Sequence, residues 1–177
     1  GTTSLASVLT SDGNQFDRNW RDYDIVTEAV LAVLKAKPSS PVKVLTDGSA
    51  PLTTFAPTDA GFQRLVKDIS GKWVAKEKDV FAAVAGLGID TVETVLLYHV
   101  VPGATITAKD AAKANGAVLT TAQGGKITVK VSRAGIRLKD ADRNSPDPRV
   151  IAVDINKGNK QIAHGINRVL RPIDLPH

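Results

Sequence analysis

The sequence predicts an α+β domain with mostly antiparallel sheet, and two observations carry this prediction. Apolar residues recur with the helical period of 3.6 through the first 115 residues and with the strand period of 2 after them. Helices and strands that are segregated along a chain are typical of α+β folds, whereas alternating helices and strands would predict a parallel sheet. A chain of 177 residues with 42% hydrophobic content is long enough to bury one core.

The first expected elements are a helix and a short strand. Asp24 precedes the stretch IVTEAVLAVLKAK, which places apolar residues on a wide helical face and ends at Pro38. Residues 42–45 are apolar and lie between two turn-forming stretches, so we expect a strand there. Residues 1–23 are polar and irregular, and we interpret them as an N-terminal extension that packs on a single domain of residues 24–177. The expected anchors of this extension are Phe16, Trp20 and Tyr23.

The stretch TTFAPTDAGF, residues 53–62, is typical of a strand that runs directly into a helix. Pro57 disfavours helix before it, and Thr58 or Asp59 is placed to cap the helix that follows. One face of that helix is apolar at positions i, i+3, i+4 and i+7: Phe62, Leu65, Val66 and Ile69. We expect a structural junction, in which Phe55 and the first residue of this apolar face enter the core.

Three further helices are expected. The first, EKDVFAAVAGLG, should stop at Gly88. The second begins with a capping-box pattern of Asp90 and Glu93, and should end near residues 98–99 because valines, a proline and a glycine follow. The third is short and begins at Thr107.

Strands are expected in the rest of the chain. Four stretches alternate apolar and polar residues or are rich in branched residues: AVLTTA, KITVKV, GIRLKD and RVIAVDI. The turns QGG, SRA and NKGN and the longer connection 140–148 join them and lead to a last segment, KQIAHGINRVLRPIDLP.

Three stretches together resemble the fasciclin-type adhesion domain (the fasciclin I-like, or beta-Ig-H3, family). They are TTFAPTDAGF, VLLYHVVPG and QIAHGINRVLRP, and their order and spacing fit this family over residues 24–175. Two positions depart from the usual third stretch. Lys160 stands where a glycine is common and Asn167 where an aspartate is common, so residue 167 offers no carboxylate to pair with a base.

The resemblance implies a wedge of two mostly antiparallel β-sheets with several α-helices packed at one edge. It also implies a secreted or surface-anchored protein that mediates attachment, has no enzyme activity and uses no cofactor. We expect its signal peptide to lie outside this sequence, and its partner to be a cell-surface or matrix protein or an anionic polysaccharide. In some animal members the resemblance links the pair Tyr98–His99 to partner recognition.

The net charge of +5 is unevenly distributed along the chain. Residues 126–177 hold 11 of the 23 Lys and Arg but only 5 of the 18 Asp and Glu. Lys126, Lys130 and Arg137 alternate with apolar residues, so the strand period places them on a face that points away from the core. We expect them to bind an anionic polymer or an acidic partner, or, as the alternative, only to keep the sheet soluble. Neighbouring cations of the same hairpin region are Arg133, Lys139 and Arg143.

The composition excludes several other classes of site. The chain has no cysteine, which removes disulfides, thiolate zinc sites and cysteine nucleophiles. His99 and His164 lie in apolar surroundings, where we expect structural hydrogen bonds and a neutral ring for His99, and no metal site. Every aromatic residue lies at or before Tyr98, so the basic third offers no base-stacking side chain and we expect no nucleic-acid partner.

The remaining alternative is a secreted hydrolase that acts on cell-surface polymers. The sequence contains no nucleophile elbow, phosphate loop or dinucleotide fingerprint. A hydrolase would therefore have to use Asp140, Asp142 or Asp147, whose spacing is similar to a calcium loop but lacks its glycine and its final glutamate. We interpret these residues as a turn-rich connection.

The first residue and the lengths of the apolar runs lead to two further expectations. The sequence contains no methionine, and we expect Gly1 to be either a processed end or an added residue. No apolar run approaches the roughly 18 residues of a membrane span, and we expect no transmembrane segment. The sequence does not decide the oligomeric state.

Overall fold

A computed structural model of the chain describes residues 1–11, 22–142 and 146–172. Its helices are α1 (Leu5–Leu9), α2 (Asp24–Ala36), the 3-10 helix η1 (Pro41–Thr46), α3 (Asp59–Ser70), α4 (Glu77–Ala85), α5 (Ile89–Leu97) and α6 (Ala108–Ala112). Its strands are β1 (Leu52–Pro57), β2 (Val100–Pro102), β3 (Val118–Thr120), β4 (Lys126–Ser132), β5 (Gly135–Lys139), β6 (Val150–Ile155) and β7 (Gln161–Ile166). The predicted α+β class is confirmed.

The described strands form two sheets. The four-stranded sheet has the order β2-β1-β7-β6, and the three-stranded sheet has the order β3-β4-β5. Neighbouring strands are antiparallel except for β1 and β7, so the expectation of mostly antiparallel sheets is confirmed. The sheets meet at one corner, where the amide of Leu138 donates to the carbonyl of Pro148 and Arg137 forms an isolated bridge with Arg149.

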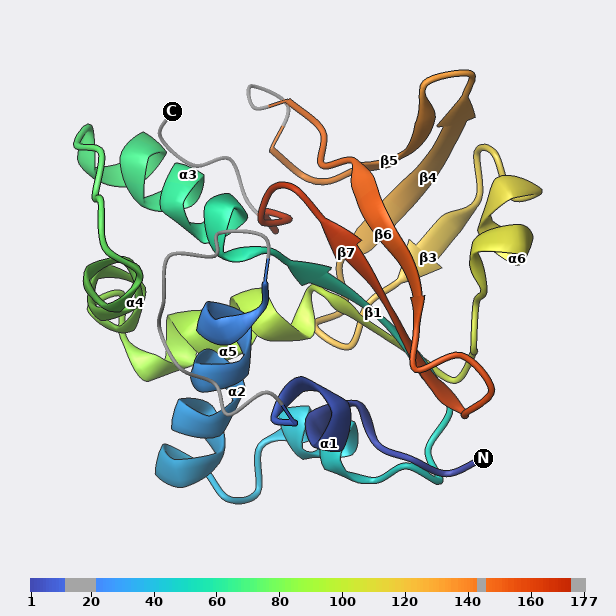
Figure 1. The fold of residues 1–177 in the computed structure, drawn as a ribbon, viewed down its shortest axis with the longest axis horizontal. Coiled ribbons are helices and arrows are strands. Elements are labelled where there is room, and N and C mark those ends of the chain that lie inside the picture. Colours follow the sequence, from blue (N-terminus) through green and yellow to red (C-terminus); the bar gives the residue numbers. More distant parts are fainter. Residues whose placement is uncertain (12–21, 143–145, 173–177) are drawn as a thin grey trace.

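The four-stranded sheet lies between two layers. Helices α1 to α5 gather on one side of it, and the three-stranded sheet lies on the other (Figure 1). Phe62 belongs to the core cluster on the helix side, and Phe55 belongs to the cluster between the sheets. Both phenylalanines are at most 3% exposed, which confirms that the junction between β1 and α3 is part of the core.

The caps expected from the sequence at two helix starts are wrong. Thr58 is the N-cap residue of α3, but its side chain makes no capping bond. The carboxylate of Asp59 instead accepts from the amide of Ile25, 2.8 Å away in the first turn of α2, so it serves a different helix. At α5 the N-cap is Gly88, whose φ of 96° is left-handed, and Glu93 accepts from the ammonium of Lys37 instead of closing a capping box.

Residues 42–45 form part of η1, so the strand expected there is also wrong. Pro41 stands in the first turn, where its missing amide is not needed, and the hydroxyl of Ser40 accepts from the amide of Val42. The side chains of Val42 and Leu45 are both buried. They are three residues apart, and the 3-10 helix has three residues per turn, so both face the core.

The start of the chain packs against the same core. Leu5 is fully buried, and its amide donates to the side-chain oxygen of Gln161, 2.9 Å away at the start of β7. Tyr23 packs against the helix-side cluster beside Gly165, where an added Cβ would lie 2.1 Å from the tyrosine oxygen. The other two expected anchors, Phe16 and Trp20, lie outside the described residues. The division at residue 23 stays a prediction.

No single helix in the described part of the chain is long and apolar enough to cross a membrane. Helices α4 and α5 together have the length and apolar composition of a span, but a bend of 103° separates them.

Candidate functional site

Tyr98 and His99 lie at the end of α5, where the helix yields to β2, and both are buried. The hydroxyl of Tyr98 donates to the carbonyl of Lys126, 2.7 Å away, and Gly125 leaves room for the tyrosine ring. Burial raises the pKa of Tyr98 to about 12. Neither side chain is accessible to a partner in this structure, so a direct role in partner binding stays a prediction.

His99 links the end of α5 to the C-terminal segment. Its Nδ1 lies 2.6 Å from the carbonyl of Val95, and its Nε2 accepts from the amide of Leu170 at 2.8 Å. This pattern requires a neutral ring with its proton on Nδ1, because a proton on Nε2 would face another N–H group. Burial lowers the pKa of His99 to about 4, against the smaller opposing effect of the bond to Val95. The expected buried and hydrogen-bonded histidine is confirmed.

This arrangement predicts acid destabilisation through His99. Its pKa lies near 4 in the folded state and near 6.5 in the unfolded chain, so the unfolded chain binds more protons between these values. His99 makes its full contribution to the free energy of unfolding above pH 6.5. This contribution, roughly 3 kcal/mol in all, is lost as the pH falls to about 4. Urea unfolding of wild type and His99→Gln across this range measures it as a difference.

The stability of the wild type must be compared with that of His99→Gln because Asp140 also titrates in this pH range, and its protonation changes the stability in the opposite direction. Burial raises the pKa of Asp140 to about 6, so acidification favours the folded state through that residue. Wild-type and His99→Gln curves that stay parallel from pH 7 to pH 4 would show that His99 is not the responsible group.

The outer face of the three-stranded sheet brings together the cations predicted from the sequence. Lys126, Lys130 and Arg137 are exposed, while Ile127, Val129 and Leu138 on the alternate positions of these strands are buried. Lys130 lies directly opposite Arg137 in the antiparallel register of β4 and β5. Lys139 is exposed on the same face, two residues beyond Arg137, opposite Thr128.

Arg149 extends this face in a way that sequence reasoning missed. It is exposed and stands opposite Arg137 in the isolated bridge between β5 and the start of β6. Lys130, Arg137 and Arg149 therefore form a row across three adjacent strands, which we call the cation row. Among the described residues, no carboxylate lies within ion-pair distance of any of its members.

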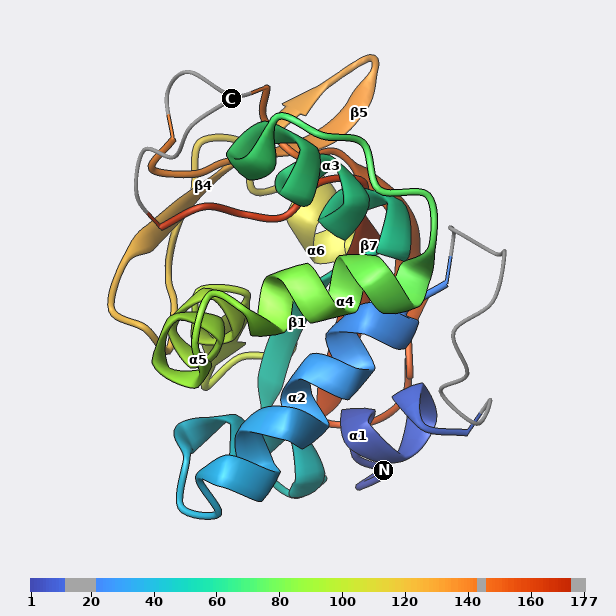
Figure 2. The same cartoon turned by 90° about the vertical axis from the view of Figure 1, so that its left-hand side faces the viewer.

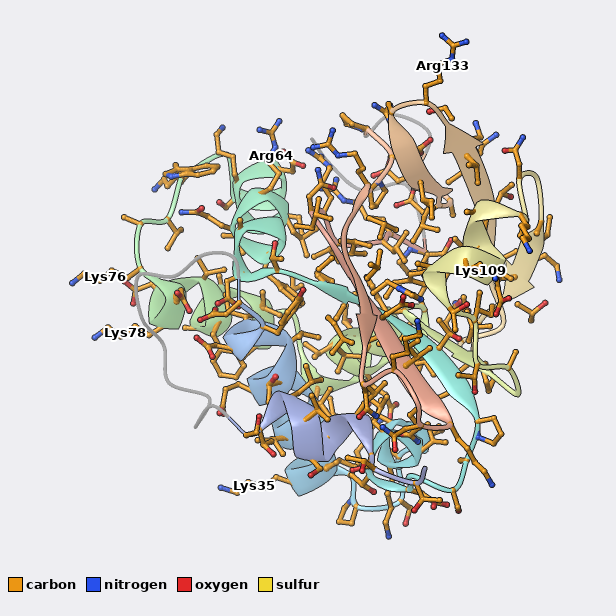
Figure 3. All side chains as sticks on the ribbon, turned by 45° about the vertical axis from the view of Figure 1, so that its right-hand side comes forward. Lys35, Arg64, Lys76, Lys78, Lys109 and Arg133 are labelled. Carbon is orange, nitrogen blue, oxygen red and sulfur yellow. The ribbon has the colours of Figure 1, made fainter. Side chains whose placement is uncertain are left out.

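Two further cations of the hairpin region have different positions. Arg133 lies at the tip of the β4–β5 hairpin, on the opposite side of the molecule from Lys76 and Lys78 (Figure 3). Arg143 lies outside the described residues.

Two of the three acids that the alternative hydrolase would use, Asp140 and Asp142, contact the C-terminal segment. Asp140 accepts from the backbone amide of Arg171 at 2.8 Å, and Asp142 lies 3.4 Å from its guanidinium. The second guanidinium nitrogen is 2.6 Å from Asp68 of α3. Asp140 and Asp142 are both buried. The third acid, Asp147, is only partly buried.

His164 is also held by the backbone. Its Nε2 lies 2.7 Å from the carbonyl of Ile106, and its Nδ1 accepts from the amide of Asp154 at 3.2 Å. Both ring nitrogens are therefore used within the fold, as expected from its apolar surroundings.

A second group of charged residues was not foreseen from the sequence. One carboxylate oxygen from each of four residues lies within 4.8 Å of the other three, and we call this group the acidic cluster. Its members are Asp22, Asp24, Asp59 and Glu77. They come from three separate segments of the chain, so local sequence patterns carry no signal for their meeting.

Comparison with known proteins identifies the fold. A model of the fasciclin domain matches residues 27–172. The chain is also similar to the structure of a FAS1 domain pair from the insect cell adhesion molecule fasciclin I, with a TM-score of 0.62 at 18% identity. That match covers 96% of this chain and 51% of the other, so this chain spans about half its length. A search of curated proteins finds no match. The chain belongs to the fasciclin domain family.

Proposed function

We propose that this chain is a non-catalytic adhesion module that attaches to an anionic surface polysaccharide through the outer face of its three-stranded sheet. Fasciclin domains occur in cell adhesion proteins at the cell surface or outside the cell, which supports the general class. The observation that carries the finer proposal is the cation row. We place the protein outside the cell, secreted or anchored at the surface.

The cation row lowers the stability of the domain when nothing is bound to it, because its like charges repel one another. Residues directly opposite in antiparallel strands have Cα atoms about 4.5–5.5 Å apart, and like charges in such pairs are destabilising. Lys130 and Arg137 form one such pair, and Arg137 and Arg149 form the next. A bound polyanion would relieve both repulsions, because its anionic groups would lie between the cations.

The spacing of the face suits a repeating anion. Opposite cations lie about 4.8 Å apart across the strands, and along the strands Arg137 and Lys139 lie about 6.8 Å apart and Lys126 and Lys130 about 13.6 Å apart, as sheet geometry dictates. Arginine binds carboxylate or sulfate groups through two parallel hydrogen bonds, so Arg137 and Arg149 add geometric selectivity to the charge. Tyr98 supports this face from below, since its hydroxyl holds the carbonyl of Lys126.

The test is retention on an immobilised sulfated or uronic-acid polysaccharide across a salt series. The quadruple variant changes Lys126, Lys130, Arg137 and Arg149 to Gln. We expect it to bind about tenfold more weakly, because each exposed ion pair contributes about 0.2–1 kcal/mol. Wild-type retention should fall as salt rises, since the Debye length is only about 8 Å at physiological ionic strength.

A matched control removes exposed cations on the helix side of the molecule. Lys35, Lys76 and Lys78 point outward there, away from the three-stranded sheet (Figure 3). Their change to Gln should leave retention nearly unchanged. The control removes three charges and the quadruple variant four, so equal losses per removed charge would reduce the effect to net charge and reject the face. Retention on polyglutamate but not on polysaccharide would replace the proposed partner with an acidic protein.

A further inference from the structure

The connection between α3 and α4 exposes a tryptophan on a basic loop. Residues 71–76 have the sequence GKWVAK, and Trp73 is 57% exposed. Tryptophan is a common anchor at interfaces, because the indole combines a large apolar body with one polar N–H group. This connection and the β4–β5 hairpin lie at opposite ends of the molecule (Figure 1). Figure 2 shows the connection facing the viewer, so it forms a surface separate from the cation row.

The backbone on both sides of Trp73 is held in place. Before it, Gly71 ends α3 with a left-handed φ of 75°, and its amide donates to a carbonyl of that helix at 2.8 Å. After it, the carbonyl of Val74 accepts from the side-chain amide of Gln63 at 2.7 Å. The side chain of Val74 packs against the core cluster on the helix side. The exposed indole is therefore presented on a supported backbone, which lowers the ordering cost of binding.

Lysines border the exposed indole. Lys72, Lys76 and Lys78 are all exposed, and Lys76 and Lys78 point outward at this end of the molecule (Figure 3). The one carboxylate between these lysines belongs to Glu77, which is only 2% exposed. Asp79 follows them, and because it is exposed it offsets one of their charges. The surface around the indole therefore keeps a net positive charge and attracts anions.

The chemistry of the exposed groups favours a lipid surface over a sugar. Recognition of a sugar would require side chains that accept hydrogen bonds from its hydroxyl groups. Residues 71–76 contain only glycine, lysine, tryptophan, valine and alanine, and none of these side chains is an acceptor. Tryptophan is instead enriched at the headgroup level of membranes, and lysines near a membrane surface are attracted to acidic lipids.

We propose that residues 71–78, which we call the Trp73 loop, dock the domain on an anionic lipid bilayer. The indole enters at the headgroup level, and the three exposed lysines lie over acidic headgroups. Binding of this kind combines buried apolar area with charge attraction and is reversible. The inference does not depend on the proposed function, because the cation row lies at the other end of the molecule and uses different residues.

The test is sedimentation of the whole chain with phospholipid vesicles. We expect binding to vesicles of phosphatidylcholine mixed with phosphatidylglycerol, and none to phosphatidylcholine alone. Trp73→Ala should bind about tenfold more weakly, because it loses the apolar area that enters the interface. Changing Lys72, Lys76 and Lys78 together to Gln should weaken binding about fivefold for each lysine, or about 100-fold in all. Absence of wild-type binding to the anionic vesicles would overturn the proposal.

A matched control removes the same number of exposed lysines elsewhere. Lys109, Lys113 and Lys157 are exposed, and Lys109 of α6 is well separated from Lys76 and Lys78 (Figure 3). Changing these three lysines to Gln should leave vesicle binding close to that of the wild type. Equal losses in the two triple variants would show an effect of net charge alone and would reject the Trp73 loop as the docking site.

Tryptophan fluorescence reports directly on entry of the indole into the interface. The chain has two tryptophans, so Trp20→Phe leaves Trp73 as the only one that emits. Its emission should shift to shorter wavelength on anionic vesicles, because the indole leaves water. Binding without this shift, or unchanged sedimentation of Trp73→Ala, would contradict docking through Trp73. Retention on a polysaccharide that depends on Trp73, without vesicle binding, would assign the Trp73 loop to a sugar and overturn the lipid proposal.

Discussion

Replacing Phe55 with alanine is expected to lower the free energy of unfolding by about 3–5 kcal/mol. Phe55 is 3% exposed and lies in the core cluster between the two sheets, with its ring 6.0 Å from that of His164. A cavity of about 30 Å³ already lies beside it, so truncation would enlarge an existing gap in an apolar layer. The neighbours are strand residues tied into ladders, which limits their ability to collapse into the space.

Chemical denaturation of Phe55→Ala beside Trp73→Ala measures this effect. Trp73 is 57% exposed, and its truncation removes a larger side chain. Its loss should change the free energy of unfolding by no more than about 0.5 kcal/mol, as is usual for surface positions. A Phe55→Ala protein as stable as the wild type would mean that the junction between β1 and α3 does not anchor the two sheets.

The second large effect is expected at Arg171, where Arg171→Met should cost about 3–5 kcal/mol. Arg171 is 1% exposed, and its guanidinium lies 2.6 Å from Asp68 and 3.4 Å from Asp142. Methionine keeps much of the volume but leaves two buried carboxylates without this cation. Weaker compensation of buried charge is the main cost, because the cations that Asp68 keeps, Arg64 and Arg168 at 3.2 and 3.3 Å, are both more exposed than Arg171.

Arg64→Met is the matched control for Arg171→Met. Arg64 also contacts Asp68, at 3.2 Å, but it is about half exposed. Its removal should cost at most about 1 kcal/mol, as for other surface ion pairs. The double variant Arg171→Met/Asp142→Asn should be more stable than the sum of its single changes predicts, because each change then removes part of the other's penalty. Strict additivity would show that Arg171 and Asp142 do not interact energetically.

The sequence predicts elements well where periodicity and stop signals agree. Helix α2 ends before Pro38, and α3 has its apolar face at the expected positions and ends at Gly71, whose φ of 75° is left-handed. The hairpin of β4 and β5 follows from alternation alone. The strand expected at residues 42–45 is wrong because the branched residues there favour extended chain only locally. In the fold, a 3-10 helix buries Val42 and Leu45, which are three residues apart.

The candidate sites are less predictable, because they depend on contacts between distant segments. Lys130 and Arg137 could be paired from the hairpin register, but Arg149 reaches them only through a bridge that spans the connection before β6. The role of Asp59 was mistaken for the same reason. An aspartate at a helix start usually caps its own helix, and only the approach of α2 turns its carboxylate to the amide of Ile25.

The parallel pairing of β1 with β7 has a consequence for how the chain acquires its structure. Leu52 pairs with Gln161, and the register continues to Pro57 and Ile166. Contacts between residues so distant in sequence carry a large loop-closure cost and slow folding. During synthesis, β1 leaves the ribosome more than a hundred residues before its central partner. Strand β1, which carries Phe55, therefore stays unpaired along one edge until β7 has been synthesised. An unpaired strand edge favours aggregation during this interval.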